Sequence, residues 1–214
     1  MAKPHYTTRW PHRSRKDTAT PATETAMDVE AELTAALSLA LERRESSSYI
    51  VEHSSRVARL ACSIAELVEL RNTELEALRM ASQLHEIGMI SVPADLLLRP
   101  SRLTPTELQR VRLQAAIGAE IVKPTHGATA ARLIERQYTD YAELRKSTAD
   151  SRELLLAGIL RVADVFDAMI DPRPYQAPVP EERWRQVLRI GSGSRFHPAA
   201  VYAILHLIRS PQYH

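Results

Sequence analysis

Four residues of this chain have side chains that could together hold a metal ion: His53, the adjacent His85 and Glu86, and Asp164. Imidazole and carboxylate ligands suit a divalent transition metal. A buried polar group needs a partner, so the same residues could instead form a hydrogen-bonded cluster that binds nothing. Their types and spacing alone leave both interpretations open.

The remaining histidines and the single cysteine add little to this set. His126 and His197 stand in breaks between expected helices, where a helix cap or a surface position is the simpler interpretation. Cys62 is the only cysteine, so the chain can form no internal disulfide and no cysteine-based zinc site. This cysteine usage fits a reducing compartment, and we expect the protein to be cytoplasmic.

Two helices should position the histidines. Between residues 48 and 70 apolar side chains recur at spacings of three and four, and His53 shares their inward face. The next helix, expected over 73–87, carries His85 along one side and should end at Gly88, since glycine commonly follows a helix end. Both imidazoles should therefore face the interior.

The rest of the chain also reads as helical. Asp164 lies in the most hydrophobic segment, 151–170, which should form the central helix. Aromatic residues make up only 5% of the chain, and alternating strand-like runs are scarce. Residues 1–26 have no apolar periodicity, so we expect a disordered tail before a helical domain at 27–214. The other helices are expected over 28–45, 104–122, 128–147, 180–190 and 198–208, with a loop over 89–103.

The overall composition excludes several classes of protein. The 214 residues include 28 lysines and arginines against 26 aspartates and glutamates, so the net charge is +2 and nothing demands a nucleic-acid partner. No apolar run approaches the roughly 18 residues of a membrane span, and the N-terminus lacks the hydrophobic core of a signal peptide. We therefore expect an all-α protein with no nucleic-acid and no membrane partner.

The sequence around the candidate ligands resembles the HD superfamily, whose members carry an early histidine and a later His-Asp pair. Further segments downstream resemble the HD-GYP subfamily in order and spacing, and the resemblance covers roughly residues 48–206. The segments that carry it are EHSSRVA (52–58), LHEIGMI (84–90), IGAEIV (117–122), RVADVFDA (161–168), RPY (173–175) and GSGSRFHP (191–198).

The resemblance implies both a fold and a chemistry. HD-GYP proteins are helical bacterial phosphodiesterases that hydrolyse cyclic di-GMP at a centre of two or three metals, usually iron or manganese. An HD-domain-like helical bundle and metal-assisted hydrolysis are thus implied here. The resemblance assigns His53, His85 and Asp164 to metal-ligand positions, and Glu86 to the position of the family's bridging aspartate.

The chain departs from the family pattern at several of these positions. Glu86 is one methylene longer than aspartate, Met89 replaces a lysine that would face phosphate, and Gln114 aligns with a family histidine. The family's paired histidines, its glutamate and its Asp-Gly-x-Gly-Tyr-Pro run are missing between Val122 and Leu154. What remains corresponds to the single-metal core of the broader superfamily.

Three functions are compatible with this pattern. The main prediction is a degenerate HD-GYP-like domain without cyclic di-GMP phosphodiesterase activity, which acts as a regulatory module through a signalling protein partner or self-association. The second is a residual phosphohydrolase with one divalent metal, iron or manganese, acting on a nucleotide or another phosphoester. The third is a sensor that binds cyclic di-GMP without cleaving it.

The segment that replaces the family's missing ligands has its own prediction. We expect the helix over 128–147 to cover the former active-site groove with Tyr138 and Tyr141. An ordinary amphipathic surface helix is the alternative.

Overall fold

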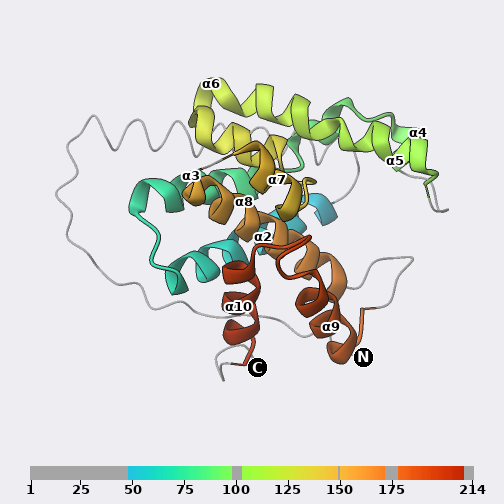
Figure 1. The fold of residues 1–214 in the computed structure, drawn as a ribbon. Helices are drawn as coiled ribbons and strands as arrows, with labels where there is room; N and C mark the ends of the chain where they lie inside the picture. The colour runs from blue at the N-terminus through green and yellow to red at the C-terminus, as the bar shows by residue number, and fades with distance from the viewer. Residues whose placement is uncertain (1–47, 98–102, 149, 172–177, 210–214) are drawn as a thin grey trace.

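The computed structural model shows an all-α architecture, as predicted, and the part of the chain that it describes contains no strand. The predicted tail at 1–26 and the helix predicted over 28–45 lie outside the described residues. The described residues are 48–97, 103–148, 150–171 and 178–209. Their helices, labelled in Figure 1, are α2 (Ser48–Leu67), α3 (Asn72–Leu84), the 3-10 helix η1 (Ile87–Ser91), α4 (Ala94–Leu97), α5 (Pro105–Arg112), α6 (Gln114–Glu135), α7 (Tyr141–Ser147), α8 (Ser151–Ile170), α9 (Glu181–Gly191) and α10 (Pro198–Leu207).

Helix α8 runs through the middle of the bundle (Figure 1). Asp150 caps its start by accepting hydrogen bonds from the backbone N–H groups of Arg152 and Glu153. Its buried apolar residues face several directions, since the helix contacts α2, α3, α6, α7, α9 and α10. The prediction of a central helix over 151–170 is confirmed.

Helices α2 and α3 pack against each other and against α8. Their apolar stripes are buried, with Val57, Ile64 and Leu78 completely inaccessible to solvent. Burial of these stripes supplies the main stabilisation of the arrangement. None of the described helices combines the length and the apolar character needed to cross a bilayer.

The connection after α3 is more helical than predicted. α3 ends at Leu84, so Gly88 is not its stop but lies inside η1. A Cβ at Gly88 would lie 1.9 Å from the carbonyl oxygen of Gln114, so the close approach of η1 to α6 explains the glycine. The short helix α4 also interrupts the loop predicted over 89–103.

The two helices predicted over 104–122 and 128–147 correspond to three helices, α5, α6 and α7, with different boundaries. Thr104 begins α5 with the expected capping box, but α5 ends at Arg112 and α6 continues to Glu135. The expected break within this stretch occurs at Gly127, whose φ of 83° is not helical. After α6 the chain turns before α7 begins, and in this turn the Gln137 amide donates to the backbone oxygens of His85 and Ile134.

Candidate metal centre

Three of the four predicted ligands meet in the structure. His53 on α2, His85 at the end of α3 and Asp164 on α8 each offer a donor atom, and these atoms all lie within 4.8 Å of one another. Oδ1 of Asp164 lies 3.3 Å from Nε2 of His53 and 3.9 Å from Nε2 of His85. Two ligand atoms, each about 2.1 Å from one ion, would be roughly 3.0–3.4 Å apart at octahedral or tetrahedral angles. The cluster is therefore close to the size that one metal ion requires.

The fourth predicted ligand, Glu86, lies at the edge of this cluster. Its Oε1 atom is 3.6 Å from Nε2 of His85, but Glu86 is outside the group whose donor atoms are all mutually close. The side chains of Glu86 and Asp164 remain 14% and 17% exposed, whereas those of His53 and His85 are only 6% and 0% exposed. The site therefore opens to solvent on its carboxylate side.

His53 has a carboxylate at each ring nitrogen. Its Nδ1 donates to Oδ2 of Asp167 at 2.7 Å, because an ionised carboxylate can only accept, and its Nε2 faces Asp164. Burial lowers the pKa of His53, but the hydrogen bonds to Asp164 and Asp167 outweigh it and raise the pKa to about 9. A carboxylate behind a histidine fixes the ring orientation and the tautomer that a metal requires.

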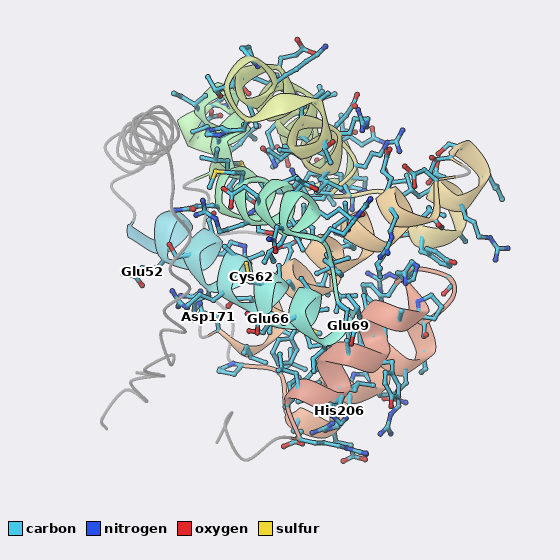
Figure 2. All side chains as sticks on the ribbon, turned by 90° about the vertical axis from the view of Figure 1, so that its left-hand side faces the viewer. Glu52, Cys62, Glu66, Glu69, Asp171 and His206 are labelled. Atoms are coloured by element: carbon cyan, nitrogen blue, oxygen red, sulfur yellow. The ribbon has the colours of Figure 1, made fainter. Side chains whose placement is uncertain are left out.

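Arg56 completes the support behind His53. Its guanidinium donates to Oδ1 of Asp167 at 2.8 Å through Nε and to Oδ2 at 3.0 Å through Nη2. Nη2 also lies 2.7 Å from Oδ2 of Asp171, which is labelled in Figure 2. Burial raises the pKa of Asp167, but His53 and Arg56 outweigh it, so the pKa is lowered and the group is ionised at neutral pH.

The imidazole of His85 is oriented by a backbone group instead of a carboxylate. Its Nδ1 donates to the backbone oxygen of Ser82 at 2.8 Å, which leaves the lone pair on Nε2. Nε2 is buried and has no hydrogen-bond partner among the described residues. A buried polar atom without a partner calls for an explanation, and a metal ligand directed toward Asp164 and Glu86 provides one. The residues present therefore fit a divalent metal.

Asp164 is ionised in this setting. Burial alone would raise the pKa of its carboxyl group, but the hydrogen bond to His53 and the positive charges of His53 and Arg161 lower it. Arg161 lies one turn earlier on α8, with Nη1 4.0 Å from Oδ2 of Asp164. The two carboxylate oxygens thus face different groups, since Oδ1 faces the histidines.

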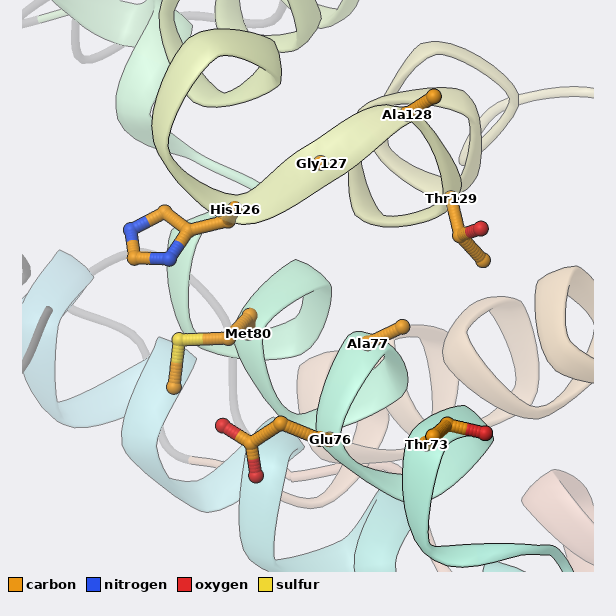
Figure 3. A pocket seen from close by; sticks show the side chains of 8 residues that line it. All are labelled: Thr73, Glu76, Ala77, Met80, His126, Gly127, Ala128 and Thr129. Carbon is orange, nitrogen blue, oxygen red and sulfur yellow. The ribbon is translucent and has the colours of Figure 1, made fainter. Parts of the chain in front are cut away.

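No second group suited to a metal occurs among the residues that the structure describes. Gln114, at the position of a family histidine, is completely buried, and its Nε2 donates to the Tyr138 hydroxyl at 2.8 Å. His126 lines a separate cavity of about 320 Å³ with Glu76 and Met80 (Figure 3). None of the predicted ligands lines that cavity.

Only one of the two expected tyrosines lies at the site. The Tyr138 hydroxyl accepts a hydrogen bond from Gln114, and burial, followed by the charge of Glu86, raises the pKa of this hydroxyl. Tyr141 instead packs edge-to-face on His197, with ring centroids 4.9 Å apart. His197 caps α10 by accepting a hydrogen bond from the backbone N–H of Ala199, which is the first of the two roles expected for it, a helix cap or a surface position.

The sequence-based site lacked two functional residues that support His53. Arg56 lies three positions after His53 on α2, and Asp167 lies three positions after Asp164 on α8. Residues three apart share a helix face, so this spacing is the signal that could have identified them.

Known proteins share this sequence pattern. The HD domain family matches residues 40–199. A cyclic di-GMP phosphodiesterase of Thermotoga maritima is 34% identical over 163 residues, which cover 72% of this chain and 44% of the relative. The cyclic di-GMP phosphodiesterase response regulator RpfG of Xanthomonas campestris pv. campestris is 31% identical over 183 residues, covering 82% of this chain and 47% of the relative. The chain thus spans less than half the length of these two relatives.

A solved structure shares the fold. Bd1817, an HDG"Y"P protein from Bdellovibrio bacteriovorus, aligns with a TM-score of 0.61 at 16% identity, over 88% of this chain and 68% of that chain. This likeness supports the helical-bundle fold described above. The chain therefore belongs to the HD domain family, and its two cyclic di-GMP phosphodiesterase relatives support the resemblance of its sequence to HD-GYP domains.

Proposed function

We propose that this domain binds one divalent metal ion through His53, His85 and Asp164, with Glu86 as a fourth ligand, and hydrolyses a phosphodiester. The observation that carries the proposal concerns Nε2 of His85, a buried atom with no hydrogen bond to any described residue, whose lone pair is directed at two carboxylates. Iron or manganese is the expected metal, because mixed imidazole and carboxylate ligands suit both.

The chain's own residues have distinct parts in this proposal. A bound divalent ion would supply charge neutralisation on the phosphate and a lowered pKa for an attacking water. Asp167 keeps the proton of His53 on Nδ1, so that Nε2 stays available as a ligand. The open carboxylate side, with Glu86 and Asp164, is where the substrate would enter. In the reaction, a water oxygen bonds to phosphorus, the ester P–O bond breaks, and the leaving oxygen takes up a proton.

A cyclic dinucleotide is the first substrate class to test. Cyclic di-GMP is the substrate in the names of the two relatives, and the matches cover 72% and 82% of this chain. Because the chain spans less than half of each relative, the activity of the whole relatives supports this choice only as a proposal.

A second candidate is a degenerate domain that no longer cleaves cyclic di-GMP. The hydrogen bond between Gln114 and Tyr138 favours it, since these side chains pair with each other at a position where the family has a ligand. Such a domain would act in the cytoplasm as a regulatory module, through a signalling protein partner or self-association. Alternatively, it would sense cyclic di-GMP without turnover.

Elemental analysis of anaerobically prepared protein separates these candidates when the same sample is assayed. Cyclic di-GMP and bis(p-nitrophenyl) phosphate serve as substrates, and His85→Ala and His126→Ala serve as site and control variants. The phosphodiesterase proposal requires that the wild-type protein hold about one metal ion per chain and hydrolyse a substrate. Metal content and turnover should both be lost in His85→Ala and retained in His126→Ala. Metal without turnover would favour the regulatory or sensor function, and equilibrium binding of cyclic di-GMP would distinguish those two. Wild-type protein without metal would contradict the metal centre itself.

A further inference from the structure

Arg161 is a cation at the metal-ligand cluster to which the proposed function assigns no contact with the substrate. It lies on α8 one turn before Asp164, with Nη1 4.0 Å from Oδ2 of that carboxylate. Its side chain is only 12% exposed, and its buried Nε has no hydrogen-bond partner among the described residues. A guanidinium stays charged in proteins and offers several N–H donors in a fixed plane. Arg161 therefore has donor capacity that its protein neighbours do not use.

Two further arginines add positive charge around Arg161. Burial is the main cause that lowers the pKa of Arg161, and the guanidiniums of Arg195 and Arg112 lower it further, while Asp164 and Asp140 act in the opposite direction. Arg112 lies over the Tyr138 ring at 5.7 Å, and Arg195 over the Phe196 ring at 5.2 Å. Neither of them forms an ion pair with any residue that the structure describes. The three arginines come from α8, the end of α5 and the loop between α9 and α10.

The orientation of Asp164 relates this cation to the metal site. One carboxylate oxygen faces the two histidines and the other faces Arg161. The carboxylate of Asp164 therefore lies between the proposed metal position and the guanidinium of Arg161. Asp164 and Arg161 both keep a small exposed surface, so an anion entering from solvent can reach both. Arginine recognises phosphate oxygens through paired N–H donors, a geometry that suits this arrangement.

We propose that Arg161 binds a non-bridging oxygen of a phosphate group held beside the metal ligands, and that Arg112 and Arg195 steer the anion toward it. The inference deepens the proposed function, since the phosphate would be that of the phosphodiester substrate. It supplies a phosphate-facing cation from α8 in a chain that has Met89 where the family pattern has a lysine. The alternative is a purely structural arginine that balances the charge of Asp164.

Calorimetric titration with inorganic phosphate tests Arg161 directly, on manganese-loaded and on metal-free protein. In Arg161→Gln the phosphate affinity should fall roughly tenfold or more, because a charged hydrogen-bond donor is lost. Arg161→Lys keeps the charge without the paired donors and should lie between wild type and Arg161→Gln. Arg183→Gln, an exposed arginine of α9 whose guanidinium contacts Gln186, is the matched control and should bind phosphate like wild type.

The exposed Arg195 provides a variant that should fold even if Arg161→Gln does not. Arg195→Gln should weaken phosphate binding about two- to threefold and reduce its dependence on salt, as expected for a steering charge. Equal phosphate affinity in wild type and both Arg161 variants, or no phosphate binding by wild type in either metal state, would overturn the inference. Metal content measured on the same samples distinguishes a failure of the proposed function from a failure of the inference about Arg161. Wild-type protein without metal contradicts the proposed function, while the phosphate affinities of the variants in metal-free protein still test the role of Arg161.

Discussion

Replacing Asp167 by asparagine should weaken metal binding without touching a metal ligand. Asp167 accepts from Nδ1 of His53 at 2.7 Å and from Arg56 at 2.8 and 3.0 Å. Loss of the carboxylate behind a ligating histidine typically lowers metal affinity about 10- to 100-fold. The same change removes charge-assisted hydrogen bonds in a buried position, which should destabilise the fold by about 2–3 kcal/mol. Arg56 remains paired with Asp171 at 2.7 Å, which limits the loss.

Proton competition sets the pH at which this effect is largest. Asp167 and Asp164 raise the pKa of His53 to about 9, so a metal must displace a proton from His53 at neutral pH. Asp167→Asn lowers that pKa, which partly offsets the lost support. The metal-affinity deficit of Asp167→Asn should therefore be near tenfold at neutral pH and widen as the pH approaches 9. In metal-free protein the effect on fold stability is instead largest at low pH. The raised pKa of His53 stabilises the fold fully below about pH 6.5, and this contribution is lost as the pH rises through about 9.

Asp171→Asn is the matched control for this measurement. It removes the other carboxylate partner of Arg56 but leaves the contact between His53 and Asp167 intact. Chelator competition should show an unchanged metal affinity for Asp171→Asn, and urea unfolding should show a loss of about 1 kcal/mol or less, because this pair is partly exposed. If the two variants bound metal equally well, Asp167 would not orient His53 and the reasoning would be refuted.

Three further predictions concern the framework and can be checked on the same preparations. Gly88→Ala should destabilise the protein by about 3 kcal/mol or more in urea unfolding, because its Cβ would lie 1.9 Å from the Gln114 carbonyl oxygen; an unchanged midpoint would contradict that contact. Arg71 lowers the pKa of Glu74 to about 2, so the pair stabilises the fold above about pH 4.5 and this contribution is lost as the pH falls toward 2. The stability difference between wild type and Glu74→Gln should shrink over that range, and a constant difference would argue against the pair. Burial raises the pKa of the Cys62 thiol to about 11, so its reaction with a disulfide reagent near neutral pH should be slow and should accelerate about tenfold or more on unfolding in urea. Equal rates in folded and unfolded protein would show that the thiol is not protected.

Local sequence signals predicted the elements that depend on local interactions. The hydrophobic segment 151–170 coincides with α8, and Thr104 begins α5 with its capping box, since both depend on contacts within a few residues. The signals failed where a distant contact decides. α6 and α7 are separate elements, and Gln137 between them bonds to the backbone of His85, a partner that the helical pattern over 128–147 does not indicate.

In the candidate site, too, the sequence predicted some features and the structure was needed for others. Residue types and the family resemblance selected His53, His85, Glu86 and Asp164, and the structure brings three of them within 4.8 Å. The lengths of side chains and the packing of η1 decided that Glu86 lies at the edge of the group, 3.6 Å from His85. Whether the four residues hold a metal stays a prediction for elemental analysis.

The helical periodicity, the buried faces that carry both histidines, and the absence of a cysteine-based site could be predicted without the fold, because each follows from composition or from residues close along the chain. The support of His53 by Asp167 and Arg56, and the position of Arg161 beside Asp164, became visible only in the folded chain. Arg56 and Asp167 are 111 positions apart. A contact at that separation forms only when the apolar stripes of α2 and α8 pack together. The spacing along each helix places Arg56 beside His53 and Asp167 beside Asp164, but it does not show that the two helix faces meet.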